Sequence, residues 1–468
     1  MKKFSIIIII LLYLLSSFSV YAADSKDDTS VISGSNTLDG QIPILGSQLV
    51  DSNMRSAILY EVNSDTIMYS YNADEKIPPS SLLKILTALI AIEKAALSDI
   101  VTVKESVLST LDPDAAKVKL VDNEVLTVKD LIYCMMVASG NDAAVVLADY
   151  VMGSQEAFVE EMNRYAANFG CVNTNFTNVH GLHDPEQYTT ARDIARILEV
   201  ALDNQDFCDA FCARYYTVPA NNKSKERKLS SQNFLINNDD NINYYDERVL
   251  GGRTAVANDR SRSIASVAES NDMKLLCVVM GAGSKYEDDG YTVRVYGGYD
   301  ETKKLLDLAF NGYKTAQLLF KNQVLMQKTV VNGTSDLSIG TKDSAFSVIP
   351  ENITENSLVY RYVNEASLSA PIEKGQRVST LQIWCGNVCI AQNDLYALNS
   401  VRSVNEIVED EETIKTSGNV LKYILIILAC IVGFAVLCFA ALYFVRIAKI
   451  TKTKIHRRNN SLYRRRSK

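Results

Sequence analysis

The sequence has little of what metal or nucleotide chemistry requires. Only three of its 468 residues are histidine, and no glycine-rich phosphate loop or internal repeat is found along the chain. His180 and His183 lie three residues apart, but no third ligand stands at a metal-site spacing from them. The sequence therefore predicts neither a metal site at this pair nor a repeat architecture.

Charged residues are also missing from two apolar segments near the ends of the chain. Lys2 and Lys3 precede an apolar run, and Val20 and Ala22 supply small residues at the −3 and −1 positions of a cleavage site. Residues 1–22 are therefore predicted to be a signal peptide. Residues 423–445 contain no charge and are long enough to cross a bilayer, so we expect a transmembrane helix there.

The distribution of charge predicts the topology. Residues 446–468 carry ten Lys or Arg and no acidic residue, which is typical of a cytoplasmic tail after a single membrane span. The formal net charge is −7; residues 1–22 contribute +2 and residues 446–468 contribute +10, which leaves −19 for residues 23–445. Residues 23–445 are expected to face outward, and a part of the chain with this negative charge repels polyanions. We therefore expect no nucleic-acid partner.

The remaining sequence divides by composition and periodicity. Residues 23–47 are predicted to be a flexible N-terminal segment, 48–315 a catalytic domain, 316–404 a small β-sandwich and 405–422 an acidic stalk. Within 48–315, a hairpin is expected at 55–62 and 67–71, helices to about 204, strands again at 276–280 and a closing helix near 301–313. This order favours an α+β fold, an antiparallel sheet flanked by a helical cluster.

Ser81 and Lys84 are the most informative pair in the chain. The apolar pattern that follows them predicts a helix, on which positions three apart share one face. A lysine that loses its charge through burial or a neighbouring cation can accept the proton of a serine nucleophile. Ser80 does not fit, because its third neighbour is Leu83. A helix start with serine caps and a solvated lysine is the alternative.

A second polar element strengthens the first. Ser139 and Asn141 interrupt two apolar segments, 131–138 and 143–148, so we expect an inward-pointing loop between two helices. Alone, such a Ser-Gly-Asn sequence would indicate only a turn. Ser-x-x-Lys followed by Ser-x-Asn is the ordered pair of motifs of penicillin-binding proteins and class A β-lactamases.

With these motifs the chain resembles the low-molecular-weight serine D-alanyl-D-alanine carboxypeptidases (peptidase S11 family). The similarity runs from about position 48 to 404 and includes the segments 79–87, 139–143, 178–193 and 369–376. His180 falls within a His-Gly-Leu stretch of this likeness. The resemblance implies a β-lactamase/transpeptidase-like fold that needs no cofactor.

The third family motif differs in this chain. Where the family has Lys-Thr-Gly, the best match is Arg253-Thr254-Ala255. Arg253 keeps the cation and has a fork able to bind a carboxylate through two hydrogen bonds. The methyl group of Ala255 stands where a glycine would permit close approach of substrate. The alternative is that Arg253 is merely a solvated strand residue.

The resemblance also implies roles for these residues. Ser81 would attack the carbonyl between two D-alanines of a peptidoglycan stem peptide, and Lys84 would take its proton. Ser139 would relay the proton to the departing amine, while Asn141 would position the substrate or Lys84. Arg253 and Thr254 would bind the terminal carboxylate, and the backbone N–H groups of Ser81 and Val256 would form the oxyanion hole. β-Lactams would acylate the same serine.

Two other functions stay open. A β-lactamase needs a further carboxylate to activate the deacylating water, and the sequence assigns that role to no acidic residue. A catalytically impaired protein that binds peptidoglycan or penicillin would instead have lost turnover through Arg253 and Ala255.

The nine cysteines are compatible with either thiols or disulfides. A disulfide is plausible between Cys385 and Cys389, and Cys208 and Cys212 are spaced to be close on a helix, but free thiols are equally compatible with both pairs. Cys430 and Cys438 lie in the predicted membrane span. The remaining three are predicted to be buried small hydrophobic residues: Cys134, Cys171 and Cys277.

Overall fold

The computed structural model describes residues 44–45, 53–239, 242–257, 259–290, 292–363, 368–404 and 422–449. The predicted signal peptide, nearly all of the flexible segment, the stalk up to residue 421 and the tail from residue 450 lie outside the described residues. The described residues form two compact units, one comprising those up to Leu318 together with Phe346–Val359 and Trp384–Ala391, and the other the remaining described residues. The predicted boundary between residues 315 and 316 stays a prediction.

The first unit contains a five-stranded sheet in the order β2-β1-β9-β8-β7. All the strand pairs reported for it are antiparallel, as predicted. The expected hairpin is confirmed. Strand β1 is buried along its whole length and β9 almost so, because helices cover both faces of the sheet. The strands are β1 (Ser56–Glu61), β2 (Thr66–Tyr71), β7 (Val249–Val256), β8 (Arg262–Ser270) and β9 (Met273–Ala282).

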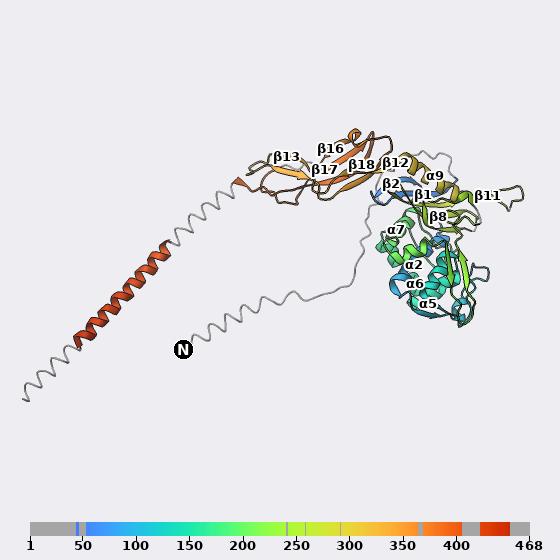
Figure 1. Cartoon of the computed structure of the whole chain (residues 1–468), viewed down its shortest axis with the longest axis horizontal. Helices are drawn as coiled ribbons and strands as arrows, with labels where there is room; N and C mark the ends of the chain where they lie inside the picture. Colours follow the sequence, from blue (N-terminus) through green and yellow to red (C-terminus); the bar gives the residue numbers. More distant parts are fainter. Residues whose placement is uncertain are drawn as a thin grey trace, which may run out of the picture. The chain divides into compact units, whose positions relative to one another are not determined.

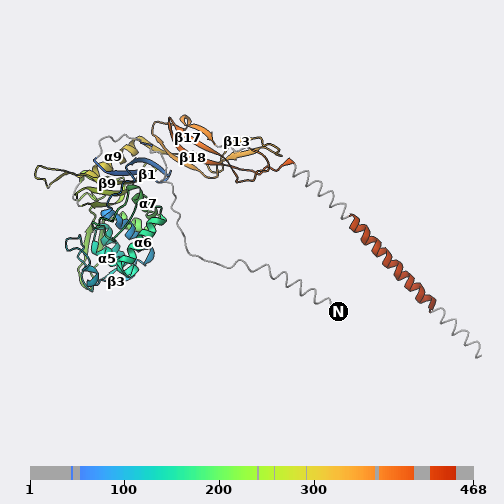
Figure 2. The ribbon, with the colours of Figure 1, turned by 180° about the vertical axis from the view of Figure 1, so that it is seen from behind.

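A helical cluster packs on one face of this sheet, and a single long helix packs on the other (Figures 1 and 2). The long helix, α9 (Gly297–Gly312), begins four residues before the predicted closing helix. The cluster comprises α2 (Lys84–Lys94), α3 (Glu105–Leu108), α4 (Val128–Val137), α5 (Asn141–Met152), α6 (Gln155–Asn168), α7 (Ala191–Ala201) and α8 (Gln205–Phe211).

Two details of the first unit differ from the sequence-based expectation. Helix α8 lies wholly beyond the expected helical limit near 204, and it begins there because the Asn204 side chain caps it by accepting a hydrogen bond from the Phe207 amide at 3.1 Å. Three short ribbons were not predicted, since strands of two to four residues carry little periodicity. They are β3 (Ile100–Thr102) with β4 (Val125–Thr127), β5 (Tyr215–Val218) with β6 (Arg227–Ser230), and β10 (Lys285–Tyr286) with β11 (Val293–Val295).

The region after α9 is built from strands, which confirms the predicted β-rich C-terminal part. A five-stranded sheet has the order β13-β14-β18-β17-β16, and β12 pairs with β15. The strands are β12 (Tyr313–Leu319), β13 (Val324–Lys328), β14 (Leu337–Gly340), β15 (Ala345–Pro350), β16 (Val359–Val363), β17 (Arg377–Cys385) and β18 (Val388–Ala397).

An apolar helix follows at Lys422–Lys449, and its 28 residues are long and apolar enough to cross a membrane. It includes the predicted span 423–445. All nine cysteines are free thiols in the structure, and Cys134, Cys171 and Cys277 are buried as predicted.

Candidate active site

Ser81 and Lys84 lie where the first helical turn of the cluster begins. Residues Ser80–Leu83 form a 3-10 helix, η2, which continues directly into α2 at Lys84. Ser80 has a φ of 45°, in the left-handed region that costs a non-glycine residue energy. The turn brings Lys84 Nζ to 3.3 Å from Ser81 Oγ. The predicted pairing of hydroxyl and amine is thus present in the structure.

Lys84 is completely buried among polar atoms. Its Nζ lies 2.5 Å from Asn141 Oδ1, 3.3 Å from the Ser139 carbonyl oxygen and 3.4 Å from Ser139 Oγ. The pKa of Lys84 is held well below its ordinary value, chiefly because burial disfavours the ammonium and also because the Arg253 charge repels it. A neutral amine has two N–H donors and one lone pair. Since Asn141 Oδ1 and the Ser139 carbonyl only accept, the lone pair is left for a hydroxyl.

Ser139 and Asn141 come from the junction of α4 and α5, as the sequence predicts. Ser139 has a φ of 61°, and its Oγ lies 3.4 Å from Ser81 Oγ. The junction is held by the buried Asp142 carboxylate, which accepts hydrogen bonds from the backbone amides of Val118, Leu120 and Ala143 at 3.0 Å. Sequence reasoning missed this role for Asp142, since two of its partners, Val118 and Leu120, lie more than twenty residues away.

Arg253 lies beneath the site and binds protein acceptors. Its Nη2 donates to Ser139 Oγ at 2.6 Å, its Nη1 to the Met136 carbonyl at 2.7 Å and its Nε to the Ser81 carbonyl at 3.3 Å. The side chain is 4% exposed, and burial lowers its pKa to about 10. Arg253 is therefore not a solvated strand residue. Because each nitrogen of its fork already has a protein acceptor, this geometry does not favour bidentate binding of a substrate carboxylate.

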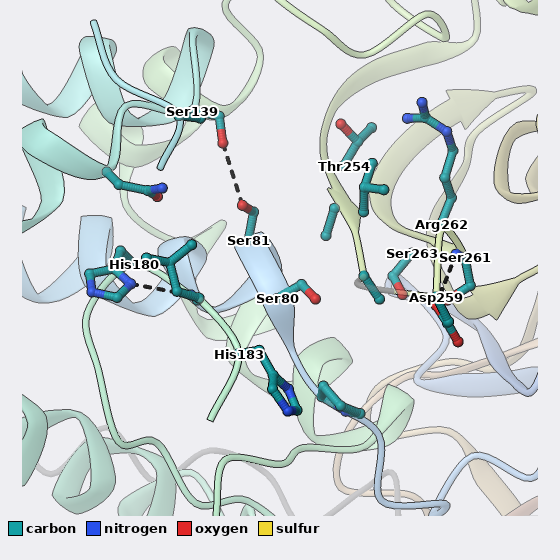
Figure 3. Close-up of a pocket in the computed structure, with 18 of the residues that line it drawn as sticks. Ser80, Ser81, Ser139, His180, His183, Thr254, Asp259, Ser261, Arg262 and Ser263 are labelled. Carbon is teal, nitrogen blue, oxygen red and sulfur yellow. Dashed lines mark hydrogen bonds between the residues drawn. The ribbon is translucent and has the colours of Figure 1, made fainter. Parts of the chain in front are cut away.

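The rest of the third motif lines a cavity of about 670 Å³. Ser81 and Ser139 lie on one side of it and Thr254 on the other (Figure 3). Asn141, Ala255 and Val256 also line the cavity. Ala255 is 4% exposed and belongs to the hydrophobic core under the helices, so its methyl group is accommodated by packing against other buried residues. The structure thus brings together all the predicted site residues, although Lys84 and Arg253 lie behind the cavity wall.

His180 and Gly181 complete the wall next to the nucleophile. His180 Nδ1 accepts a hydrogen bond from the Leu182 amide at 3.2 Å. Burial, and secondarily repulsion by Lys84 when that residue is protonated, lowers the pKa of His180 to about 4. Gly181 has a φ of 88°, and a Cβ there would lie 2.1 Å from the Ser80 carbonyl oxygen and 3.0 Å from the Ser81 amide nitrogen. Only glycine lets this loop support the backbone of Ser80 and Ser81 so closely.

We expect Gly181→Ala to slow acylation of Ser81 by roughly tenfold or more, because the added methyl group displaces the Ser80–Ser81 backbone from its position. Gly153→Ala is the matched control. Gly153 also has a positive φ, of 79°, but a Cβ there meets nothing within 4 Å. Labelling by a fluorescent penicillin measures both variants; equal rates for the two would contradict a role for this contact.

Known proteins share this architecture. A sequence profile of D-alanyl-D-alanine carboxypeptidases matches residues 46–284, and a profile of the penicillin-binding protein 5 C-terminal domain matches residues 313–403. The D-alanyl-D-alanine carboxypeptidase DacA of Haemophilus influenzae is 32% identical over 353 residues, covering 74% of this chain and 84% of the relative. DacF of Bacillus subtilis is 28% identical over 354 residues, covering 74% and 86%.

The fold agrees with these sequence similarities. The crystal structure of penicillin-binding protein 5 from Haemophilus influenzae superimposes with a TM-score of 0.63 and 30% identity, covering 75% of this chain and 98% of that one. The carboxypeptidase profile matches the region that contains the five-stranded sheet with its helices, and the C-terminal-domain profile matches the strands that follow α9. The chain therefore belongs to the D-alanyl-D-alanine carboxypeptidase family, peptidase S11.

Proposed function

We propose that this protein is a serine D-alanyl-D-alanine carboxypeptidase that removes the terminal D-alanine from peptidoglycan stem peptides through an acyl-enzyme on Ser81. The observation that carries the proposal is the environment of Lys84. Its amine is buried, and burial together with the Arg253 charge lowers its pKa, which favours the neutral form. Both N–H groups of the neutral amine have hydrogen-bond acceptors, so its lone pair is available to the Ser81 hydroxyl.

The remaining residues have complementary roles in this mechanism. Ser139 accepts a hydrogen bond from Arg253, which leaves its own hydrogen free to pass to the departing D-alanine amine; Lys84 then restores that proton. Asn141 orients Lys84. Thr254, which lines the cavity, binds the terminal carboxylate, and Arg253 adds its positive charge from behind the wall.

The acyl carbonyl needs donors where negative charge develops. Ser81 and Val256 both line the cavity, and their backbone N–H groups are the candidates for an oxyanion hole. Water then hydrolyses the acyl-enzyme and releases the shortened peptide. β-Lactams, which mimic the dipeptide, would acylate the same serine, and no step in this scheme calls for a cofactor.

We further propose that the protein acts outside the cytoplasmic membrane, anchored by the helix Lys422–Lys449 with its basic tail inside. The acidic body and the predicted signal peptide support this orientation. Protease added to intact cells should digest the ectodomain and spare a short fragment that begins near Tyr423. Protection of the whole ectodomain would contradict the proposed topology.

A mass spectrum after exposure to penicillin tests the proposed nucleophile. The native protein should gain one acyl group, Ser81→Ala should gain none, and Ser80→Ala, the neighbouring control, should still be labelled. Labelling that depends on Ser80 instead would contradict the assignment. D-Alanine release from a D-Ala-D-Ala peptide, measured in parallel, separates the carboxypeptidase from the impaired binding protein, which would be acylated or bind peptidoglycan without releasing D-alanine.

A further inference from the structure

Two arginines line the cavity, and they differ in their partners. Arg55 is paired with Glu75, to which it donates two hydrogen bonds of 3.0 and 2.6 Å. Arg262 has no hydrogen-bond acceptor or carboxylate partner for its guanidinium among the residues that the structure describes. A cation that lines an active-site cavity without a protein counter-ion is suited to an anionic ligand.

Arg262 is held on an aromatic surface. Its guanidinium carbon lies 4.5 Å from the ring centroid of Tyr296 and 5.7 Å from that of Tyr299. Tyr299 is fully buried and donates a hydrogen bond of 2.9 Å to the Gln232 carbonyl oxygen. These contacts orient the guanidinium but leave its positive charge unpaired, because an aromatic ring attracts a cation without carrying a negative charge of its own.

Close packing of the backbone fixes where the side chain of Arg262 begins. A Cβ at Gly298, in the first turn of α9, would lie 3.0 Å from Arg262 Cβ. On the other side, Arg262 of β8 pairs with Val256 of β7, two residues beyond Thr254. Figure 3 shows Thr254 and Arg262 on the same side of the cavity, across from Ser139. Arg262 thus lines the same side of the cavity as Thr254, the residue to which the carboxylate is assigned.

Resting on the proposed function, we propose that Arg262 is the residue that binds the terminal carboxylate of the peptide substrate, together with Thr254. The cation of the third motif, Arg253, does not take this role, because its guanidinium donates hydrogen bonds to Ser81, Met136 and Ser139. Two arginines of this chain thereby share the work of the cation in the third motif. Arg253 positions the catalytic groups, and Arg262 recognises the substrate anion.

The test compares two peptides that differ only in the anion. A peptide ending in D-Ala-D-Ala and its C-terminal amide are titrated by NMR into the full-length Ser81→Ala protein in detergent, which cannot turn either peptide over. We expect the free carboxylate to bind roughly 10- to 100-fold more tightly than the amide, as for a charge-assisted hydrogen bond. Adding Arg262→Gln should abolish this preference, and Arg262→Lys should keep part of it.

Arg260→Gln is the matched control, because Arg260 lies on the same hairpin but does not line the cavity. The preference is a ratio measured within one protein, so partial unfolding of a variant does not change it. A preference that survives Arg262→Gln, or its absence from the Ser81→Ala parent, would overturn the assignment of Arg262. If the carboxylate preference depends on Arg262 but native protein forms no acyl adduct, the proposed function fails while the carboxylate site stands.

Discussion

Replacing Lys84 with alanine is expected to slow acylation of Ser81 by at least about 100-fold, the scale on which general-base removal usually acts. Lys84 is the basic group that contacts Ser81 Oγ, and its amine is buried with both N–H groups satisfied. The rate constant for labelling by a fluorescent penicillin measures the effect. Lys94→Ala, at the far end of the same helix and paired with Glu161, is the control.

The pH dependence of acylation is a second test of Lys84 as the base. Lys84 accepts a proton only when it is neutral, so the rate should rise as the pH rises through the pKa of Lys84 and then level off. Because burial and the Arg253 charge lower that pKa, the rise should lie well below the range of an ordinary lysine. A rate that is undiminished in Lys84→Ala, or that rises only near pH 10, would remove Lys84 as the base.

Arg253→Lys should slow acylation by roughly tenfold, and Arg253→Gln by roughly 100-fold. A lysine cannot reproduce a planar fork that meets three separate acceptors on η2, α4 and the junction after it. Glutamine also removes the charge that lowers the pKa of Lys84. The acid limb of the pH–rate profile should therefore move to higher pH in Arg253→Gln, so that alkaline buffer restores part of the rate.

Arg248→Lys provides the matched control for this series. Arg248 precedes the same strand, pairs with Asp246 and Asp307, and does not line the cavity. Faster acylation or faster D-alanine release in Arg253→Lys would show that lysine is the better residue here and that the native chain is a weakened enzyme. An unshifted pH profile in Arg253→Gln would show that Arg253 does not act through the charge of Lys84.

Local spacing made much of this site predictable. Ser81 and Lys84 are three residues apart at a helix start, and Ser139 and Asn141 interrupt two apolar helices, so short-range geometry alone places each pair. The hairpin and the α+β order were predictable for a similar reason, because periodicity reports which face of a strand or helix is buried. The short ribbons and helix α8 were not predictable, since the ribbons depend on a few residues each and α8 on a side-chain cap.

The sequence by itself thus determined the fold class, the family and which residues carry hydroxyl, amine and cation. Only the tertiary structure decided how the cations are used. Whether a guanidinium meets a substrate or a protein carbonyl depends on residues far away in the chain: Met136 lies 117 positions from Arg253, and Ser81 lies 172. Likewise, the sequence does not distinguish Arg262 from its other arginines. Its packing against α9 and its pairing with β7 place it in the wall of the cavity that Thr254 also lines, without a counter-ion among the residues that the structure describes.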